Sequence, residues 1–359
     1  MKFKKFKSLK SIKRKRNPLY SRLKKIRLEK NERVSEYNSN FLKKIKLNLK
    51  SEHISAYPEV EELYKVIAKK LSVTADMIVL TAGSDIAIKN CFELLISPGD
   101  EVITLNPTYG MVDIYSRLYQ AKQIKINYDK NLILDKTKLF KSINKKTNLV
   151  ILANPNSPTG TIIDEKSILK VIKLCKKYNS YVLIDECYFG YYSKSMIKYT
   201  KSYSNLIISR SFSKIGLAGC RIGYLIASKK TSKMLYKFRP FYELTSFSCL
   251  VLKQILKNQR IFKDYINQTL NGKIYLMKNL KKLNFDFFST NTNFILIKLK
   301  SKIIKNKLIK IFARENILVL GESKLPEGNR ILRITLGPKK YMNVVVNQLR
   351  KMSKNAIPN

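Results

Sequence analysis

Hydrophobic and polar positions change their period along this chain in a regular way. Apolar residues at helical spacing predict a helix over 59–71 and a second helix over 85–95. Short apolar runs between such helical stretches predict strands. These strands are expected at 77–80, 101–105, 123–126, 149–152, 181–184, 206–208 and 224–226. The alternation predicts βαβ crossovers, and therefore an α/β fold with a mostly parallel sheet flanked by helices.

Polar motifs follow several of the predicted strands. In a parallel sheet, ligand-binding residues gather at the carboxyl ends of the strands, so these motifs are expected to lie close together. They are Gly83-Ser84-Asp85, Asn106-Pro-Thr-Tyr109, Asn154 to Gly160, Asp185-Glu-Cys-Tyr188 and Ser211-Phe-Ser-Lys214.

The motif that ends at Lys214 gives the most specific chemical prediction. A lysine placed between hydroxyls and an arginine can form an imine with a phosphorylated aldehyde cofactor. The hydroxyls of Ser211 and Ser213, together with Arg221, can bind the phosphate of such a cofactor.

The motif at Ser84 fits the same phosphate. A strand, a glycine turn and a helix start point backbone N–H groups at one spot, with the Ser84 hydroxyl as a further donor. An ordinary turn with Ser84 as a helix cap explains the same residues. Tyr109 can stack on a flat heteroaromatic ring, or it is a packed loop tyrosine.

The remaining motifs suggest how the rest of a cofactor and its substrate are held. Asp185 ends a buried strand and needs a partner, such as a protonated pyridine nitrogen, unless it caps the following helix. Tyr188 can donate to a ring oxygen, as can Asn156 or Ser157 in a rigid loop with two prolines. Arg333 stands between apolar neighbours, where it binds either a substrate carboxylate or an internal carboxylate.

Composition removes several classes of site. The 359 residues, 45% of them hydrophobic, exceed one typical domain and can bury a large core. The five cysteines form no CxxC pair, which argues against a disulfide framework and against a metal site and fits a reducing compartment. His53 is the only histidine, so mechanisms that need two histidines are excluded. No apolar run is long enough to span a membrane.

The charge of the chain is strongly positive. Lys and Arg number 71 against 25 acidic residues, which gives a net charge of +46. The basic residues are spread along the whole sequence, so a solvated lysine-rich surface and specific polyanion binding both stay open. Residues 1–26 form a separate basic arm that is too polar for a signal peptide and is either a flexible tail or an organelle-targeting leader. Otherwise a cytoplasmic location is expected.

Together, the order and spacing of these motifs resemble the class I/II aminotransferases of fold type I, which depend on pyridoxal 5'-phosphate. Within them the chain looks most like the histidinol-phosphate aminotransferase branch. The resemblance covers roughly residues 27–350. It rests on the motifs above and on Asn31-Glu32, Tyr57-Pro-Glu59, Thr292-Asn-Phe294 and Arg333-Ile-Thr-Leu-Gly337.

The resemblance implies a three-layer fold with a smaller α/β domain at the C-terminus. The large, cofactor-binding domain is expected at 50–235 and the small domain at 236–359. The segment 27–49 is expected to pack with the small domain. The family also implies a homodimer with shared active sites.

The resemblance implies a role for each matching residue. Lys214 would hold the cofactor covalently and serve as the base at the substrate α-carbon, with Asp185 and Tyr188 as further catalytic residues. Asp185 would pair with the ring nitrogen, Tyr188 with the ring oxygen, and Tyr109 would lie against the ring. Ser84, Asp85, Ser211 and Arg221 would hold the phosphate, and Tyr57 would reach the phosphate in the neighbouring subunit. Arg333 and Asn293 would bind the substrate.

Some positions depart from the family pattern. Ser157 stands where asparagine is usual, the loop between Lys214 and Arg221 is one residue shorter, and Leu320 replaces an arginine that binds the substrate phosphate. Arg330 is a candidate to compensate for that arginine. The expected reaction moves an amino group between a donor, such as histidinol phosphate or an aromatic amino acid, and a 2-oxo acid. A decarboxylase of the threonine-phosphate type and a basic polyanion-binding protein with a relic site are the alternatives.

Overall fold

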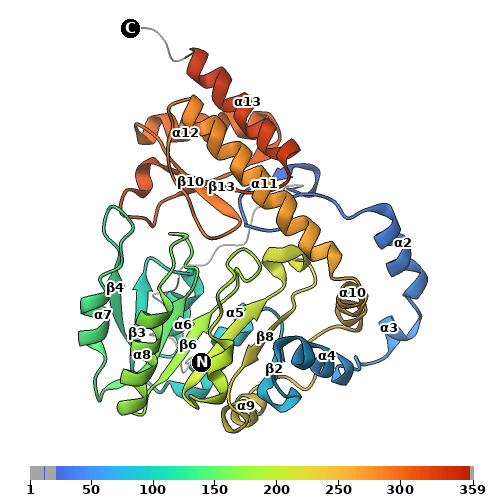
Figure 1. The fold of residues 1–359 in the computed structure, drawn as a ribbon, viewed down its shortest axis with the longest axis vertical. Coiled ribbons are helices and arrows are strands. Elements are labelled where there is room, and N and C mark those ends of the chain that lie inside the picture. The colour runs from blue at the N-terminus through green and yellow to red at the C-terminus, as the bar shows by residue number, and fades with distance from the viewer. Residues whose placement is uncertain (1–11, 13–21, 356–359) are drawn as a thin grey trace, which may run out of the picture.

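The computed structural model describes residue 12 and residues 22–355, and most of the predicted basic arm lies outside these ranges. The fold consists of two packed parts, each built on its own sheet (Figure 1). Within the described residues, no helix is long and apolar enough to cross a membrane.

The larger part contains a seven-stranded sheet in the order β2-β8-β7-β6-β5-β3-β4. Its strands are β2 (Ile78–Thr81), β3 (Glu101–Asn106), β4 (Lys122–Asn127), β5 (Thr147–Ala153), β6 (Tyr181–Asp185), β7 (Leu206–Ser211) and β8 (Gly223–Ile226). Five neighbouring strands, β4, β3, β5, β6 and β7, run parallel to one another. Strand β8 is antiparallel to both of its neighbours, β2 and β7. The predicted α/β fold with a mostly parallel central sheet is therefore confirmed.

Helices cover both faces of this sheet, because its strands carry apolar side chains on both sides. One face packs against α2 (Ser39–Asn48), α4 (Glu61–Leu71), α7 (Lys136–Ser142), α8 (Glu165–Lys177) and α10 (Ser246–Lys257). The other face packs against α5 (Ser84–Leu95), α6 (Gly110–Leu118) and α9 (Lys229–Tyr236). The short helix α3 (Glu52–Ser55) lies beside α10. The result is a three-layer arrangement.

The smaller part contains a four-stranded antiparallel sheet in the order β12-β13-β10-β9. Its strands are β9 (Asp286–Phe288), β10 (Phe294–Lys298), β12 (Leu320–Glu322) and β13 (Ile331–Thr335). One face packs against α11 (Arg260–Lys282), α12 (Lys302–Arg314) and α13 (Lys339–Asn355), which lie at the top of Figure 1. The opposite face contributes Phe294, Leu296 and Ile331 to a small cluster with Cys187 and Tyr188, which come from the larger part.

Two parts of the predicted domain division need correction. The segment 27–49 is shared: β1 (Ile26–Arg27) pairs with β11 (Ile317–Leu318) in the smaller part, whereas Phe41 and Ile45 of α2 join the core of the larger part. The predicted boundary after residue 235 falls too early, because the buried apolar face of α10 packs against the larger sheet. An amphipathic helix can serve either part, and its sequence does not say which.

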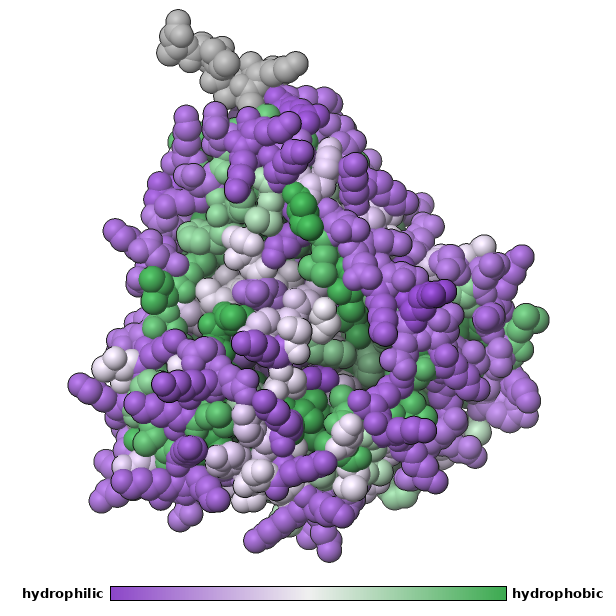
Figure 2. Space-filling view, in the orientation of Figure 1, coloured by the Kyte–Doolittle hydropathy of each residue, from purple (hydrophilic) through white to green (hydrophobic). Residues whose placement is uncertain are grey.

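The surface seen in Figure 2 is mostly hydrophilic. This agrees with the many lysines on the outer faces of the helices, of which Lys69 and Lys70 in α4 and Lys176 and Lys177 in α8 are examples.

Candidate active site

A cavity of about 780 Å³ lies between the two parts. The larger sheet lines it with strand ends and the turns that follow them. The smaller part contributes Arg333 and residues 320–324, and the N-terminal segment contributes Arg22 and residues 29–32. The cavity therefore brings together Ser84, Asp85, Tyr109, Ser157, Asp185, Tyr188, Ser211, Ser213, Lys214, Arg221 and Arg333, as predicted from the sequence.

Lys214 lies in a short π-helical turn, Ser213–Leu217, that directly follows β7. Its ammonium lies 5.9 Å from the centre of the Tyr188 ring and donates only a long hydrogen bond, 3.4 Å, to the Lys30 carbonyl. Burial lowers the pKa of Lys214 below its ordinary value. An amine with a lowered pKa is a better nucleophile and base at neutral pH than a surface lysine.

Asp185 is the last residue of β6 and is 3% exposed. Its Oδ1 atom is buried without a hydrogen-bond partner. Burial raises the pKa of Asp185 to about 7, although the nearby Lys214 acts in the opposite direction. A buried carboxylate oxygen without a partner is costly, so this atom fits a cationic N–H group supplied by a ligand.

The Tyr188 hydroxyl lies at the back of the cavity and accepts a hydrogen bond of 2.9 Å from Asn31 Nδ2. Ser157 approaches the same hydroxyl. Burial raises the pKa of Tyr188, so the phenol keeps its proton and can donate it to a ligand oxygen.

The start of α5 forms a compact cradle with the turn before β8. Gly83 has a φ of +84°, and a Cβ at Gly223 would lie 2.8 Å from the Ser84 nitrogen. Only a residue without a side chain lets the two segments approach so closely. Arg221, with a φ of +52°, brings its guanidinium to within 3.0 Å of the Cβ position of Gly83. Despite the shorter loop, Arg221 therefore reaches the helix N-terminus, where an anion is favoured.

Hydroxyl groups surround this cradle. Ser211 Oγ donates to Ser213 Oγ at 2.8 Å and accepts from the Ser213 backbone N–H at 3.1 Å. The Asp85 side chain accepts from Tyr115 at 2.9 Å, which holds its carboxylate on the helix side and leaves its backbone N–H in the first turn of α5.

The structure separates the two neighbours in the Asn154–Gly160 loop. Ser157 lines the cavity, but Asn156 is fully buried and does not. The Asn156 amide donates to the Pro107 carbonyl and to Thr159 at 2.9 Å each, and its oxygen accepts from Thr108 at 2.8 Å. Asn156 therefore holds two loops together beside the cavity, and its contact with a cofactor stays a prediction.

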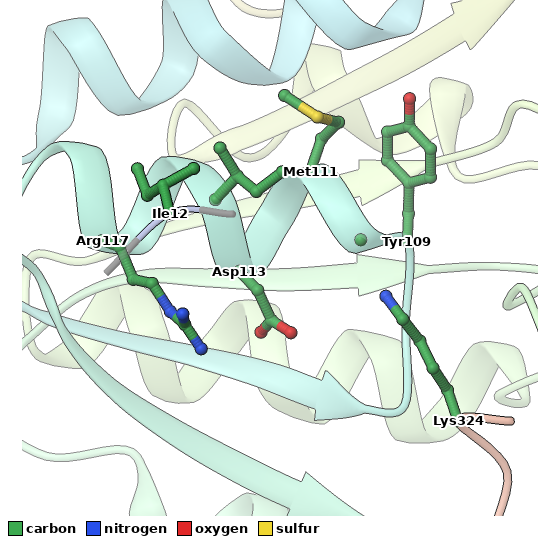
Figure 3. Close-up of a pocket in the computed structure, with 8 residues that line it drawn as sticks. Ile12, Tyr109, Met111, Asp113, Arg117 and Lys324 are labelled. Atoms are coloured by element: carbon green, nitrogen blue, oxygen red, sulfur yellow. The ribbon is translucent and has the colours of Figure 1, made fainter. Parts of the chain in front are cut away.

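Tyr109 stands at the rim, directly before α6, and is 39% exposed. It also lines a second, shallower hollow of about 500 Å³ that runs along α6. Figure 3 shows Lys324 pointing from the smaller part toward Tyr109 and the start of α6. The Tyr109 ring is thus placed over the entrance, where it can lie against a flat ligand.

Arg333 extends from β13 into the cavity. Its Nη2 donates to the Glu29 carbonyl at 3.0 Å, its Nη1 lies 3.5 Å from Glu322 Oε2, and its Nε has no partner. The sequence left two interpretations of Arg333 open, an internal ion pair and a bound substrate carboxylate. Both have support, because Glu322 provides an internal carboxylate and the Nε of Arg333 remains without a partner. Arg330 pairs with Glu327 at 2.5 Å and does not line the cavity.

Two predicted residues lie outside the cavity. Asn293 is fully buried behind it and donates to the carbonyls of Asn31 at 3.0 Å and Lys214 at 3.5 Å. This corrects the prediction that Asn293 lines the substrate pocket. Tyr57 is 76% exposed and stacks on Tyr242, with ring centres 4.3 Å apart.

Several residues that line the cavity were not predicted as site residues, and three of them lie beside its polar groups. They are Asn31, which holds the Tyr188 hydroxyl, Glu322, which lies beside Arg333, and Cys187, which lies beside Asp185. Asn31 was visible in the sequence as part of a family motif, whereas Glu322 carries no local signal. Within the described residues, no group of three His, Cys, Asp or Glu side chains could hold a metal ion.

Comparison with known proteins identifies the family. The family model described as aminotransferase class I and II matches residues 11–349. This chain therefore belongs to the class I and II aminotransferases.

Individual relatives agree. The chain is 31% identical to a histidinol-phosphate aminotransferase of Caldanaerobacter subterraneus subsp. tengcongensis, over 91% of this chain and 93% of the relative. Its fold matches that of the histidinol-phosphate aminotransferase of Clostridium acetobutylicum with a TM-score of 0.80 at 22% identity, over 92% of this chain and 99% of the other. The Sinorhizobium meliloti enzyme, solved with pyridoxal 5'-phosphate, gives 0.80 at 20% identity, over 92% and 91%.

The protein is an aminotransferase that depends on pyridoxal 5'-phosphate, and its amino donor and 2-oxo acid acceptor are small molecules. The residues present fit this cofactor. The partnerless Asp185 Oδ1 suits its ring nitrogen, and the close approach of Gly223 to the N-terminus of α5, with Arg221 beside it, suits its phosphate.

Proposed function

We propose that this enzyme binds the carboxylate of its substrates at Arg333 and moves the α-proton with Lys214. The observation that carries the proposal is that Lys214, the partnerless oxygen of Asp185 and the free Nε of Arg333 all belong to one cavity. Pyridoxal phosphate, when bound, supplies an aldehyde that captures an amino group and a cationic ring that takes up electrons.

Lys214 holds the cofactor and then acts as the base at the substrate α-carbon. The lowered pKa of Lys214 supports this role, since a larger fraction of its amine is unprotonated near neutral pH. Its position directly after β7 fixes the stem of the side chain on a rigid strand end.

Asp185 keeps the ring nitrogen protonated by pairing with it, which its buried, unsatisfied Oδ1 supports. Tyr188, held by Asn31, donates to the ring oxygen. Ser84, the Asp85 backbone, Ser211, Ser213 and Arg221 would hold the phosphate at the N-terminus of α5, and Tyr109 would cover the ring at the entrance.

Histidinol phosphate is the first amino donor to test, because it gives the curated relatives their names. Leu320 leaves an apolar side chain opposite Arg333 on the neighbouring strand. Since no arginine stands at this position to bind a substrate phosphate, amino acids such as glutamate and the aromatic amino acids are further donors to test beside histidinol phosphate.

The decisive experiment follows the half-reaction of the holoenzyme with each donor, read as the change in absorbance of the bound cofactor. Wild type is expected to respond to at least one donor and to form an amino acid when a 2-oxo acid is added. Lys214→Ala should lose both responses while keeping its fold. Release of carbon dioxide without any acceptor would instead support a decarboxylase.

We also propose that the enzyme is a homodimer in which Tyr57 completes the partner's phosphate site. Tyr57 and Phe241, which both pack against the Tyr242 ring, form an exposed apolar patch, with exposed fractions of 76% and 82%. A patch of such exposed side chains is typical of an interaction surface. Mixing inactive Lys214→Ala with Tyr57→Ala should restore activity, because a mixed dimer contains one intact site. A monomer by sedimentation, or no restoration, would contradict the dimer.

A further inference from the structure

The carboxylate of Glu322 lies beside the proposed substrate anchor, Arg333. Residues Leu320 and Arg333 face each other across β12 and β13, and Glu322 follows two residues later on the same face of the sheet. Its Oε2 atom is 3.5 Å from Arg333 Nη1, and the two side chains are only 7% and 12% exposed. Both residues line the cavity.

Backbone groups fix the Glu322 carboxylate in this position. Its Oε1 atom accepts hydrogen bonds of 3.1 Å from the N–H groups of Ser323 and Lys324. Because the carboxylate is tied to its own turn, it cannot swing away when a substrate reaches Arg333. Glu322 is thus part of the anchor rather than a movable side chain at its rim.

Among the described residues, Arg333 is the one that forms an ion pair with Glu322: the nearby Lys305 donates to the Gly328 carbonyl, and Lys324 points to the start of α6. Arg22 is paired with Glu29 at 2.5 Å and with Glu32 at 2.7 Å, and Arg221 lies at the start of α5 on the cofactor side. Leu320, directly opposite Arg333, adds no charge. The pair of Arg333 and Glu322 is therefore close to neutral before a substrate binds.

We propose that Glu322 is a specificity-determining residue, which makes the anchor select a singly charged carboxylate over the doubly charged phosphate of a phosphate monoester. This inference rests on the proposed binding of substrates at Arg333. The substrate class it names is amino acids and 2-oxo acids that carry an α-carboxylate. Histidinol phosphate has no α-carboxylate and would present its phosphate to the same pair.

The preference for a carboxylate over a phosphate follows from the charges of the two groups. A carboxylate that joins the pair brings one negative charge near Glu322, and a phosphate dianion brings two. At a few ångströms in a partly buried site, the additional repulsion is large enough to change a dissociation constant by about tenfold or more.

The test uses holoenzyme and two simple probes, inorganic phosphate at pH 8 and acetate. Inhibition constants against the amino donor and dissociation constants from calorimetric titration are measured for wild type and Glu322→Gln. Glutamine keeps an oxygen that can accept from Ser323 and Lys324 but removes the charge. We expect Glu322→Gln to bind phosphate about tenfold or more tightly and acetate only a few-fold more tightly.

Two further variants control the result. Glu322→Asp keeps the charge and should keep the wild-type preference. Glu327→Gln removes a carboxylate from the same loop, paired with Lys298 and Arg330 outside the cavity, and should change neither constant. An unchanged ratio of phosphate to acetate binding in Glu322→Gln would overturn the proposal. Calorimetry needs no turnover, so this outcome is separable from a failure of amino transfer.

Discussion

Asp185 and Glu186 are neighbours at the end of β6, and both are almost fully buried, with 3% and 4% exposed. Glu186 accepts hydrogen bonds from Arg210 at 2.9 and 3.0 Å, from Ser195 at 2.8 Å and from the Met196 N–H at 2.7 Å. Asp185 keeps an oxygen without any partner. Both oxygens of Glu186 are therefore hydrogen-bonded, whereas Asp185 has one oxygen that is not.

Their basic partners differ in the same way. Arg210 is bonded to Glu186 and Ser195 and packs over the Phe189 ring, whereas Lys214 has one long hydrogen bond. A satisfied buried pair holds the fold together, and an unsatisfied one is ready to bind a ligand. Burial alone therefore does not identify the active site. Within this pair of neighbours, the carboxylate with an unsatisfied oxygen is the one that lines the cavity.

The largest expected effect is on catalysis, from Asp185→Asn. Asparagine keeps the size of the side chain but cannot keep the ring nitrogen protonated, so we expect turnover to fall roughly 10³-fold, about 4 kcal/mol in the barrier. Single-turnover kinetics with the best donor measures it. The stability of the cofactor-free protein should not fall, because the lost oxygen has no partner. A variant with nearly full turnover would show that Asp185 is not the partner of the ring.

Glu186→Gln should lower the stability of the protein and leave turnover almost unchanged, the reverse of Asp185→Asn. Removing one charge leaves Arg210 buried without its counter-ion, which should lower the free energy of unfolding by about 3 kcal/mol. Urea unfolding of wild type and variant provides the measurement, and turnover per folded molecule should stay close to that of wild type. If the two proteins unfold at the same urea concentration, the proposed structural role of the pair is wrong.

The third prediction concerns pH. The Asp185 carboxyl has a pKa of about 7 when folded and an ordinary value of 3.8 when unfolded. Between these values the folded state holds a proton that the unfolded state has released, so stability falls as pH rises. From pH 5 to pH 7 the loss should be about 2 kcal/mol in cofactor-free wild type, relative to Asp185→Asn.

Lys214, whose lowered pKa adds a slope of opposite sign, is present in both proteins, and this slope cancels only in part because Asp185 itself raises the pKa of that amine. Urea unfolding at several pH values gives the difference curve. Parallel curves for the two proteins would mean that the folded Asp185 has an ordinary pKa.

The sequence predicted the alternation of strands and helices well and the contacts between side chains less well. Lys214 and Asp185 were predictable because each directly follows an apolar strand, and the carboxyl ends of parallel strands meet at one edge. The choice between Asn156 and Ser157 was not, because the backbone of the loop decides which neighbour faces the cavity. Glu322 was missed because its contact with Arg333 depends on the pairing of β12 with β13.

The smallest expected effect is that of Tyr188→Phe. The Tyr188 hydroxyl is partly satisfied, and so lies between the fully bonded Glu186 carboxylate and the Asp185 carboxylate with its partnerless oxygen. The Tyr188 hydroxyl accepts from Asn31 at 2.9 Å but still has its own proton to donate. Loss of one hydrogen bond to a ligand oxygen should lower kcat/KM about tenfold, near 1 kcal/mol. The absorbance of the bound cofactor, followed against pH, should shift as well, because the ring oxygen loses a donor. Tyr192→Phe, four residues further on and outside the cavity, is the matched control and should shift neither quantity. Tyr188→Phe could instead destabilise the protein and leave the pH dependence of that absorbance unchanged. In that case the Tyr188 hydroxyl has a structural role, like the carboxylate of Glu186, and does not bind the cofactor.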